Sequence, residues 1–257
     1  MQATGLLAVF AHPDDESLMA GGLLARYAAA GARTGVVTAT WAPGTVRAAE
    51  LADAVRTLGA GEPRLLGYAD ARVPESAPDE VRFCDAPLDA AVGRLVSHIR
   101  EFRPDTVVTH DGYGNATGHP DHVHTHRLAV LAVHAAGLDG LFPDAGEPWQ
   151  PGALYLATHP RSFLATLADE LGARKGLFGV PDEQVTAAVD VGPWLDRKIA
   201  ALLCHRSEVA RGALPGQVER MSREPREKLF STEWYVRHWP TPAPTPAPGW
   251  GPPELAL

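Results

Sequence analysis

The sequence predicts an α/β domain in which a mostly parallel sheet lies between two layers of helices. Short aliphatic and β-branched runs alternate with longer segments of helical periodicity, which is typical of repeated βαβ units. The first run, residues 5–11 (GLLAVFA), carries no polar side chain, as expected of a strand buried on both faces. With 257 residues, the chain is long enough to bury the core of one large domain.

The predicted elements follow one another in βαβ order. Strands are expected at residues 5–11, 34–41, 64–70, 104–110, 152–158 and 186–191. Helices are expected at residues 16–31, 46–60, 86–102, 119–137 and 193–210. Acidic residues open the first helix and Gly31 ends it, while Pro193 suits the first turn of the last helix. This order favours a Rossmann-like αβα sandwich.

One domain is expected over residues 1–238. Residues 239–257 (WPTPAPTPAPGWGPPELAL) are so rich in proline and alanine that we expect an extended C-terminal tail.

Composition excludes several classes of protein. The net charge of -8 and the absence of a basic stripe argue against a nucleic-acid binder. No apolar stretch reaches the roughly 18 residues needed to span a membrane, and the start lacks a signal-peptide pattern. Cys84 and Cys204 lie far apart and outside any C-x-x-C pattern, so no disulfide or cysteine zinc site is expected. We therefore expect a cytoplasmic protein.

Two polar clusters follow predicted strands. AHPDDE (11–16) comes directly after the first strand, and GHPDHVHTH (118–126) follows the strand at 104–110. The carboxyl ends of parallel strands open into one crevice, where ligands bind. Three consecutive acidic residues repel one another unless a positive charge lies among them. The pattern therefore indicates a cation at this edge of the sheet.

A catalytic zinc ion is the cation that these residue types favour. Such an ion takes three ligands from histidine and carboxylate side chains and leaves a fourth position for water. His12 and Asp15 lie three residues apart on a strand-to-helix turn, so both can face one point, and a histidine of the HPDH segment completes the set. Asp14 is then free to accept a proton from the water, whose pKa the ion lowers to about 7.

Other interpretations of these residues stay open at the level of sequence. An Asp-Asp-Glu run before a helix is commonly an N-terminal cap that offsets the helix dipole. His122 and His126, at i and i+4, are an alternative pair of metal ligands. Gly21 and Gly22 do not form a G-x-G-x-x-G fingerprint, so a nicotinamide cofactor is not supported.

The motifs AHPDDESLMAGG and TGHPDHVHTH resemble the two signature motifs of the LmbE-like (PIG-L) zinc-dependent N-deacetylases. The segment RAAELADAVRTLGAGEPRLLGYAD between them also resembles this family, so the likeness covers about the first 140 residues. Among relatives, the chain looks closest to actinobacterial enzymes of mycothiol metabolism and to antibiotic deacetylases. The resemblance implies the LmbE-like variant of the αβα fold.

Matched by motif position, the resemblance implies His12, Asp15 and His122 as the zinc ligands. It implies Asp14 as general base and His119 as the group that polarises the carbonyl or stabilises the oxyanion. A His2Asp site also suits Fe²⁺.

The resemblance also implies supporting residues. Asp121 would orient a neighbouring histidine, and we expect Glu16 to support the ligands by hydrogen bonding. Arg47 and Asp70 would bind sugar hydroxyls, and His205 would contact the substrate.

The expected function is hydrolysis of an amide, most simply N-deacetylation of an N-acetylglucosamine-type conjugate, a small molecule, with release of acetate. One alternative is an amidase that removes a bulkier acyl group, as the mycothiol S-conjugate amidases do. Another is a non-catalytic sugar- or nucleotide-binding protein, although binding alone does not need the base Asp14. A metal-stabilised structural protein would instead need a closed site of four ligands.

Overall fold

The computed structural model describes residues 5–172 and 176–239. Its seven-stranded sheet has the order β3-β2-β1-β4-β5-β7-β6. The strands are β1 (Gly5–Phe10), β2 (Arg33–Thr40), β3 (Arg64–Tyr68), β4 (Thr106–His110), β5 (Ala153–Thr158), β6 (Ala187–Asp190) and β7 (Thr232–Trp239). β1 to β5 pair in parallel, and β7 runs antiparallel to both β5 and β6. The predicted mostly parallel sheet is therefore confirmed.

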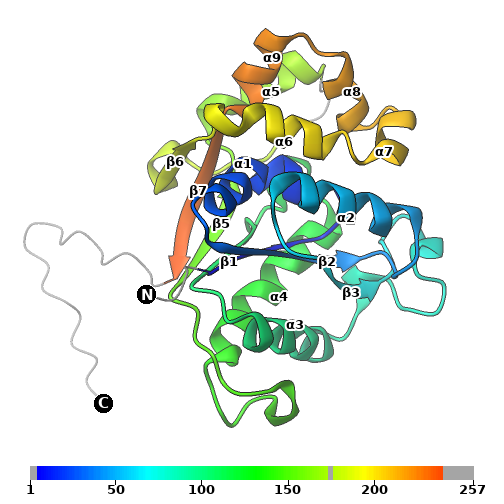
Figure 1. Cartoon of the computed structure of the whole chain (residues 1–257), viewed down its shortest axis with the longest axis vertical. Helices are drawn as coiled ribbons and strands as arrows, with labels where there is room; N and C mark the ends of the chain where they lie inside the picture. The colour runs from blue at the N-terminus through cyan, green and yellow to red at the C-terminus, as the bar shows by residue number, and fades with distance from the viewer. Residues whose placement is uncertain (1–4, 173–175, 240–257) are drawn as a thin grey trace, which may run out of the picture.

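Helices cover both faces of the sheet (Figure 1). The helices that pack on one face are α1 (Asp15–Ala29), α2 (Val46–Leu58) and α6 (Leu195–Leu202). Those on the other face are α3 (Leu88–Phe102) and α4 (Pro120–Ala136). Alternate residues of β1 contribute to the two apolar cores, with Leu6 and Phe10 in one and Leu7 in the other. This explains why the first strand lacks polar side chains.

The remaining helices form an additional layer beyond α1 (Figure 1). They are α5 (Arg161–Leu171), α7 (Arg206–Ala210), α8 (Leu214–Arg220) and α9 (Arg223–Phe230). Residues of α5, α6, α8 and α9 share a third apolar cluster that includes Leu167, Ile199, Val218 and Leu229.

The order of the strands reverses between β1 and β4. β1 pairs with β2 on one side and with β4 on the other, so the chain fills one half of the sheet before it starts the second. The carboxyl ends of β1 and β4 therefore border a crevice at the switch point, which is where open α/β sheets bind ligands. Both polar sequence clusters begin at this crevice.

Gly22 lets α1 approach the C-terminal part of the chain closely. A Cβ atom on Gly22 would lie 2.3 Å from Cβ of Val191, a contact that no larger residue can make. The backbone N–H of Gly22 also donates to Glu233 on β7, at 2.8 Å. Close packing, rather than phosphate binding, accounts for this glycine.

The structure differs from the sequence-based expectation mainly after residue 160. The single helix expected at 193–210 is interrupted between α6 and α7, where His205 turns inward to Glu16. The sequence analysis also missed α5, α8, α9 and β7. β7 mixes charged and aromatic residues because a polar contact network and an apolar core both use it. Trp239 is its last residue, and residues 240–257 lie outside the described part of the chain.

None of the helices within the described ranges has the length and apolar character needed to cross a bilayer.

Arg100 secures the loop that follows α4. Its buried guanidinium makes six hydrogen bonds, all to backbone carbonyl oxygens of residues 135–146. A positive charge at the C-terminal end of a helix also offsets the negative end of the helix dipole. One side chain therefore satisfies carbonyl groups that the end of α4 and its loop would otherwise bury unpaired.

We expect Arg100→Met to lower the free energy of unfolding by about 2–4 kcal/mol, because it leaves buried acceptors without donors. Chemical denaturation monitored by circular dichroism measures the change. Arg56→Met is the control, since the Arg56 side chain is 66% exposed and its ion pair with Asp53 lies on the surface. Surface pairs of this kind contribute about 0–1 kcal/mol. Equal stabilities for the two variants would contradict this role of Arg100.

Candidate active site

Three donor atoms meet at the switch point. Nδ1 of His12 lies 3.1 Å from Nε2 of His122 and 3.3 Å from Oδ2 of Asp15. The third side of this triangle, between His122 Nε2 and Asp15 Oδ2, is 3.4 Å. In a tetrahedral zinc site with metal–ligand distances of about 2.0–2.1 Å, neighbouring ligand atoms lie about 3.3 Å apart. The spacing of the three atoms therefore fits a metal ion.

Hydrogen bonds on the far side of each ring orient the two histidines. Nε2 of His12 lies 3.1 Å from Oδ2 of Asp121, and Nδ1 of His122 lies 3.2 Å from the carbonyl oxygen of Gly114. Both acceptors require an N–H on the nitrogen that faces them. The opposite nitrogens then direct lone pairs at each other and at Asp15, an arrangement that only a cation or a proton makes favourable.

The raised pKa of His12 indicates that a positive charge is favoured at this point. Burial disfavours the charged ring, but the hydrogen bonds to Asp121 and Asp15 and the charges of Asp15 and Asp70 outweigh it. Together they raise the pKa of His12 to about 10. The carboxylates around His12 thus favour a positive charge at the point where the three donors meet.

Asp14 lies next to this cluster but belongs to none of the potential metal-binding groups found among the described residues. Its backbone has φ 125°, a strained conformation for a residue with a side chain, and its carboxylate makes no cap hydrogen bond to α1. The simple N-cap interpretation is therefore wrong for Asp14. Burial is the largest influence on Asp14 and raises its pKa to about 7, against the opposing charge of Arg47. Carboxylates with such a pKa suit proton transfer near neutral pH.

His119 stands at the other side of His12, with ring centroids 4.7 Å apart in an edge-to-face contact. Its Nδ1 accepts the backbone N–H of Asp121 at 3.3 Å, so a neutral His119 carries its proton on Nε2. Burial, together with the charges of His12 and Arg72, lowers the pKa of His119 to about 4. The ring is therefore a neutral hydrogen-bond donor at pH 7.

Glu16 and His205 support the loop from within the protein. Nε2 of His205 lies 2.9 Å from Oε1 of Glu16, and both side chains are fully buried. The other oxygen of Glu16 accepts the backbone N–H of Asp14 at 2.9 Å. The sequence analysis expected His205 to contact substrate, whereas the structure places it behind the acidic loop.

Arg47 and Asp70, the expected sugar ligands, are both engaged within the site. Arg47 forms ion pairs of 3.2 Å with Asp14 and with Glu208, and it also donates to the carbonyl oxygen of Pro13. Asp70 lies 3.3 Å from Nε2 of His12. Arg47 thus lies between the first strand-to-helix turn and α7, a link that the sequence pattern did not reveal.

His110 and Asn115 lie beside the predicted metal ligands. The ring of His110 stacks on that of His122, with centroids 4.1 Å apart, and its Nδ1 contacts Oδ1 of Asn115. The position of His110 at the end of β4 was the available sequence signal, but no motif pointed to Asn115. His126, the alternative partner of His122, instead contacts the backbone oxygen of His110 and belongs to none of the potential metal clusters of the described chain.

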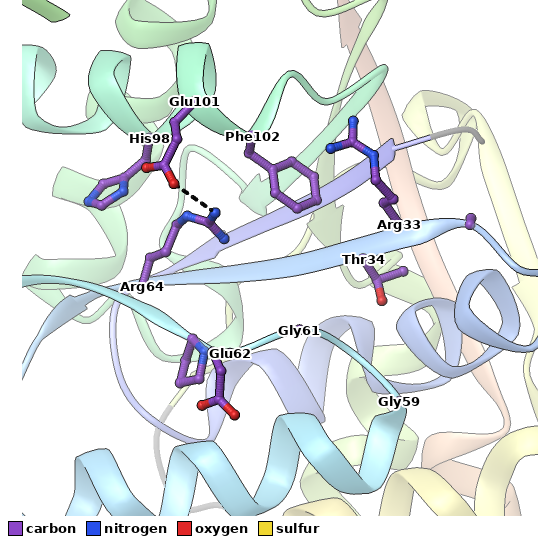
Figure 2. A pocket seen from close by; sticks show the side chains of 11 residues that line it. Arg33, Thr34, Gly59, Gly61, Glu62, Arg64, His98, Glu101 and Phe102 are labelled. Carbon is purple, nitrogen blue, oxygen red and sulfur yellow. Dashed lines mark hydrogen bonds and ion pairs between the residues drawn. The ribbon is translucent and has the colours of Figure 1, made fainter. Parts of the chain in front are cut away.

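A separate surface hollow lies away from this site (Figure 2). It is lined by residues at the beginnings of β2 and β3 and at the end of α3, including Arg33, Arg64 and Phe102. Its acidic and basic side chains offset one another, as in the pair between Arg64 and Glu101 at 3.4 Å. It therefore lacks the convergent donors that distinguish the switch point.

Known proteins match this chain over most of its length. A family model described as GlcNAc-PI de-N-acetylase (PIG-L) matches residues 7–133. A 1D-myo-inositol 2-acetamido-2-deoxy-alpha-D-glucopyranoside deacetylase from Rhodococcus jostii (strain RHA1) is 37% identical over 271 residues, covering 92% of each chain. The chain belongs to the PIG-L family. Membership of this family of de-N-acetylases confirms the expectation of a hydrolase of N-acetyl amide bonds.

Solved structures share the fold of this PIG-L protein across several activities. An N,N'-diacetylchitobiose deacetylase from Pyrococcus horikoshii has a TM-score of 0.64 at 18% identity, covering 91% of this chain and 84% of that chain. A 4-carboxy-2-hydroxymuconate hydratase from Pseudomonas putida KT2440 has a TM-score of 0.60 at 18% identity, covering 95% and 100%. Since one of these proteins is a hydratase, the fold alone does not determine the reaction.

We expect Asp121→Ala to weaken zinc binding about 10- to 100-fold, because His12 loses the carboxylate that orients its ring. Competition with a chromophoric chelator at fixed pH measures the affinity. Asp53→Ala, which removes a half-exposed carboxylate from α2, serves as the control. An unchanged affinity in a folded Asp121→Ala variant would show that this contact does not orient the ligand.

Proposed function

We propose that the protein is a zinc-dependent N-deacetylase of a glucosamine unit linked to inositol or to a similar polar group. The observation that carries this proposal is the convergence of His12, Asp15 and His122 on one point, with Asp14 beside them outside the ligand set. A relative that is 37% identical over most of both chains, and that is named for an inositol-linked substrate, supports this choice. Fe²⁺ is the alternative ion for such a donor set.

A divalent cation bound by these three residues supplies Lewis acidity to the amide carbonyl oxygen and to the attacking water. The chain itself supplies the groups that move and hold protons. Asp14 accepts a proton from the water while the oxygen atom of the water bonds to the carbonyl carbon. When the C–N bond breaks, Asp14 returns the proton to the departing amine, and acetate and the free amino sugar are released.

Arg47 sets the charge state of Asp14. Its guanidinium lies 3.2 Å from the Asp14 carboxylate and lowers the pKa that burial raises. Glu208, 3.2 Å away on the other side, holds Arg47 in place. Arg47 therefore keeps the base partly ionised near neutral pH.

In the same proposal, Arg47 and Asp70 provide the polar border of the site on which sugar hydroxyls bind.

His119 donates a hydrogen bond to the oxyanion that develops on the carbonyl oxygen. Its neutral ring carries the proton on Nε2, because Nδ1 accepts the backbone N–H of Asp121. A donor held in place before the reaction stabilises developing charge without reorganisation, which is the basis of oxyanion holes.

The direct test measures acetate release from N-acetylglucosaminyl-inositol by the zinc-loaded protein, the chelator-treated protein and Asp14→Ala. We expect Asp14→Ala to lower kcat by about 10²–10⁴-fold while its zinc content stays at the wild-type level. Asp53→Ala is the matched control, which removes a half-exposed carboxylate whose ion pair is with Arg56, and we expect it to keep full activity. Activity that survives chelation, or more than a tenth of kcat in Asp14→Ala, would overturn the proposal.

We expect His119→Ala to lower kcat about 10²- to 10³-fold with little change in KM, because its hydrogen bond forms in the transition state. Steady-state kinetics on the same substrate separates the two constants. A rise in KM at unchanged kcat would assign His119 to substrate binding instead.

A further inference from the structure

A cavity of about 150 Å³ adjoins the metal ligands. Asp15 and His122 both line it, so it reaches the point at which the amide would be held. The rest of its wall comes largely from the C-terminal layer of helices, which lies beyond α1 in Figure 1, and from the first residues of β7.

The wall of this cavity is apolar. Among the side chains that line it are Leu18, Leu167, Leu171, Leu214, Leu229 and Phe230. Its main polar side chains are already paired with protein atoms. Lys198 binds Glu233 at 2.7 Å, and the amide nitrogen of Asn115 donates to the carbonyl oxygen of Ala157 at 2.7 Å.

His159 is the exception, because its Nδ1 is buried without a hydrogen-bond partner among residues 5–172 and 176–239. Burial lowers the pKa of His159 to about 4, so the ring is neutral at pH 7. A cavity with these walls suits hydrocarbon, whereas a sugar needs unpaired donors and acceptors for its hydroxyl groups.

The residues proposed to transfer protons, to stabilise the oxyanion and to bind sugar hydroxyls do not line this cavity. Asp14, Arg47, Asp70 and His119 are absent from the described residues that surround it. The two halves of the substrate on either side of the amide bond therefore meet different surroundings. The amine half meets charged groups, and the acyl half meets leucine and phenylalanine side chains.

We infer that this cavity receives the acyl group of the substrate and is built for an aliphatic acyl group of about six carbons, larger than acetyl. The inference rests on the proposed function and extends it from the N-acetyl amide to a longer N-acyl amide of the same amino sugar. The length of the acyl group follows from the volume of the cavity, because an apolar cavity of about 150 Å³ is known to hold a six-carbon molecule such as benzene. An acetyl group would leave most of the cavity unfilled.

The expected gain follows from burial of methylene groups. Each methylene that moves from water into an apolar site is worth about a threefold to fourfold gain in binding. Hexanoyl has four methylenes more than acetyl. Allowing for incomplete burial, we expect kcat/KM to rise about 10- to 100-fold from acetyl to hexanoyl.

The experiment uses the full zinc-loaded chain and three substrates that differ only in the acyl group: N-acetyl-, N-hexanoyl- and N-decanoyl-glucosaminyl-inositol. The expected order of kcat/KM is hexanoyl first, with acetyl at least about tenfold lower and decanoyl below hexanoyl, because a ten-carbon chain exceeds the cavity volume of about 150 Å³. Acetate release at a higher kcat/KM than hexanoate release would overturn the inference and leave the proposed function standing. Absence of release from all three substrates would overturn the proposed function itself.

A variant that fills the cavity tests whether the residues that line it cause the preference for hexanoyl over acetyl. Ala116 lines the cavity, so Ala116→Leu should lower the hexanoyl-to-acetyl ratio of kcat/KM at least about tenfold. Ala90→Leu makes the same change at an exposed position of α3 and should leave the ratio at its wild-type value. Leu214→Ala enlarges the cavity and should move the preference toward decanoyl. A wild-type ratio in a folded Ala116→Leu variant would show that the acyl group binds elsewhere.

Discussion

Mutual repulsion among buried carboxylates is the constraint on which this site depends. Asp15, Asp70 and Asp121 are almost fully buried within contact of His12, and Asp14 lies beside them. In a medium of low dielectric constant, such charges persist only beside positive partners. Arg47 and His12 compensate part of this charge, and a bound cation would compensate the rest. The fold therefore assembles a place where a metal ion is stabilising.

The parallel sheet provides the rigidity that such an arrangement needs. β1 and β4 are buried between two layers of helices. The first polar cluster begins directly at the carboxyl end of β1, and the second follows the loop that leaves β4. The strained backbone of Asp14 costs on the order of 1–3 kcal/mol, which the surrounding packing must offset. Buried contacts from Glu16 to the backbone of Asp14 and to His205 hold this conformation.

Reaction and substrate choice reside in different parts of the molecule. The donors and the base lie at the turn from β1 into α1 and in the first turn of α4, at the switch point where folds of this kind place their chemistry. The helices after residue 160 cover these loops and shape the apolar side of the site. A protein with the same sheet can therefore change its reaction by altering the loops, and its acyl preference by altering the helices.

The sequence by itself determined the α/β architecture, the order of the first five strands along the chain and the two polar loops, because their periodicity and motif spacing are local. Spacing indicated His12 and Asp15 as ligands, and the family resemblance implied His122 as the third. The structure brings these three side chains within 3.4 Å of one another. Only the tertiary structure decided that β7 joins the sheet antiparallel and that His205 is buried. It alone also revealed the apolar cavity beside the ligands. These features arise from contacts between residues far apart in the chain, which no local pattern records.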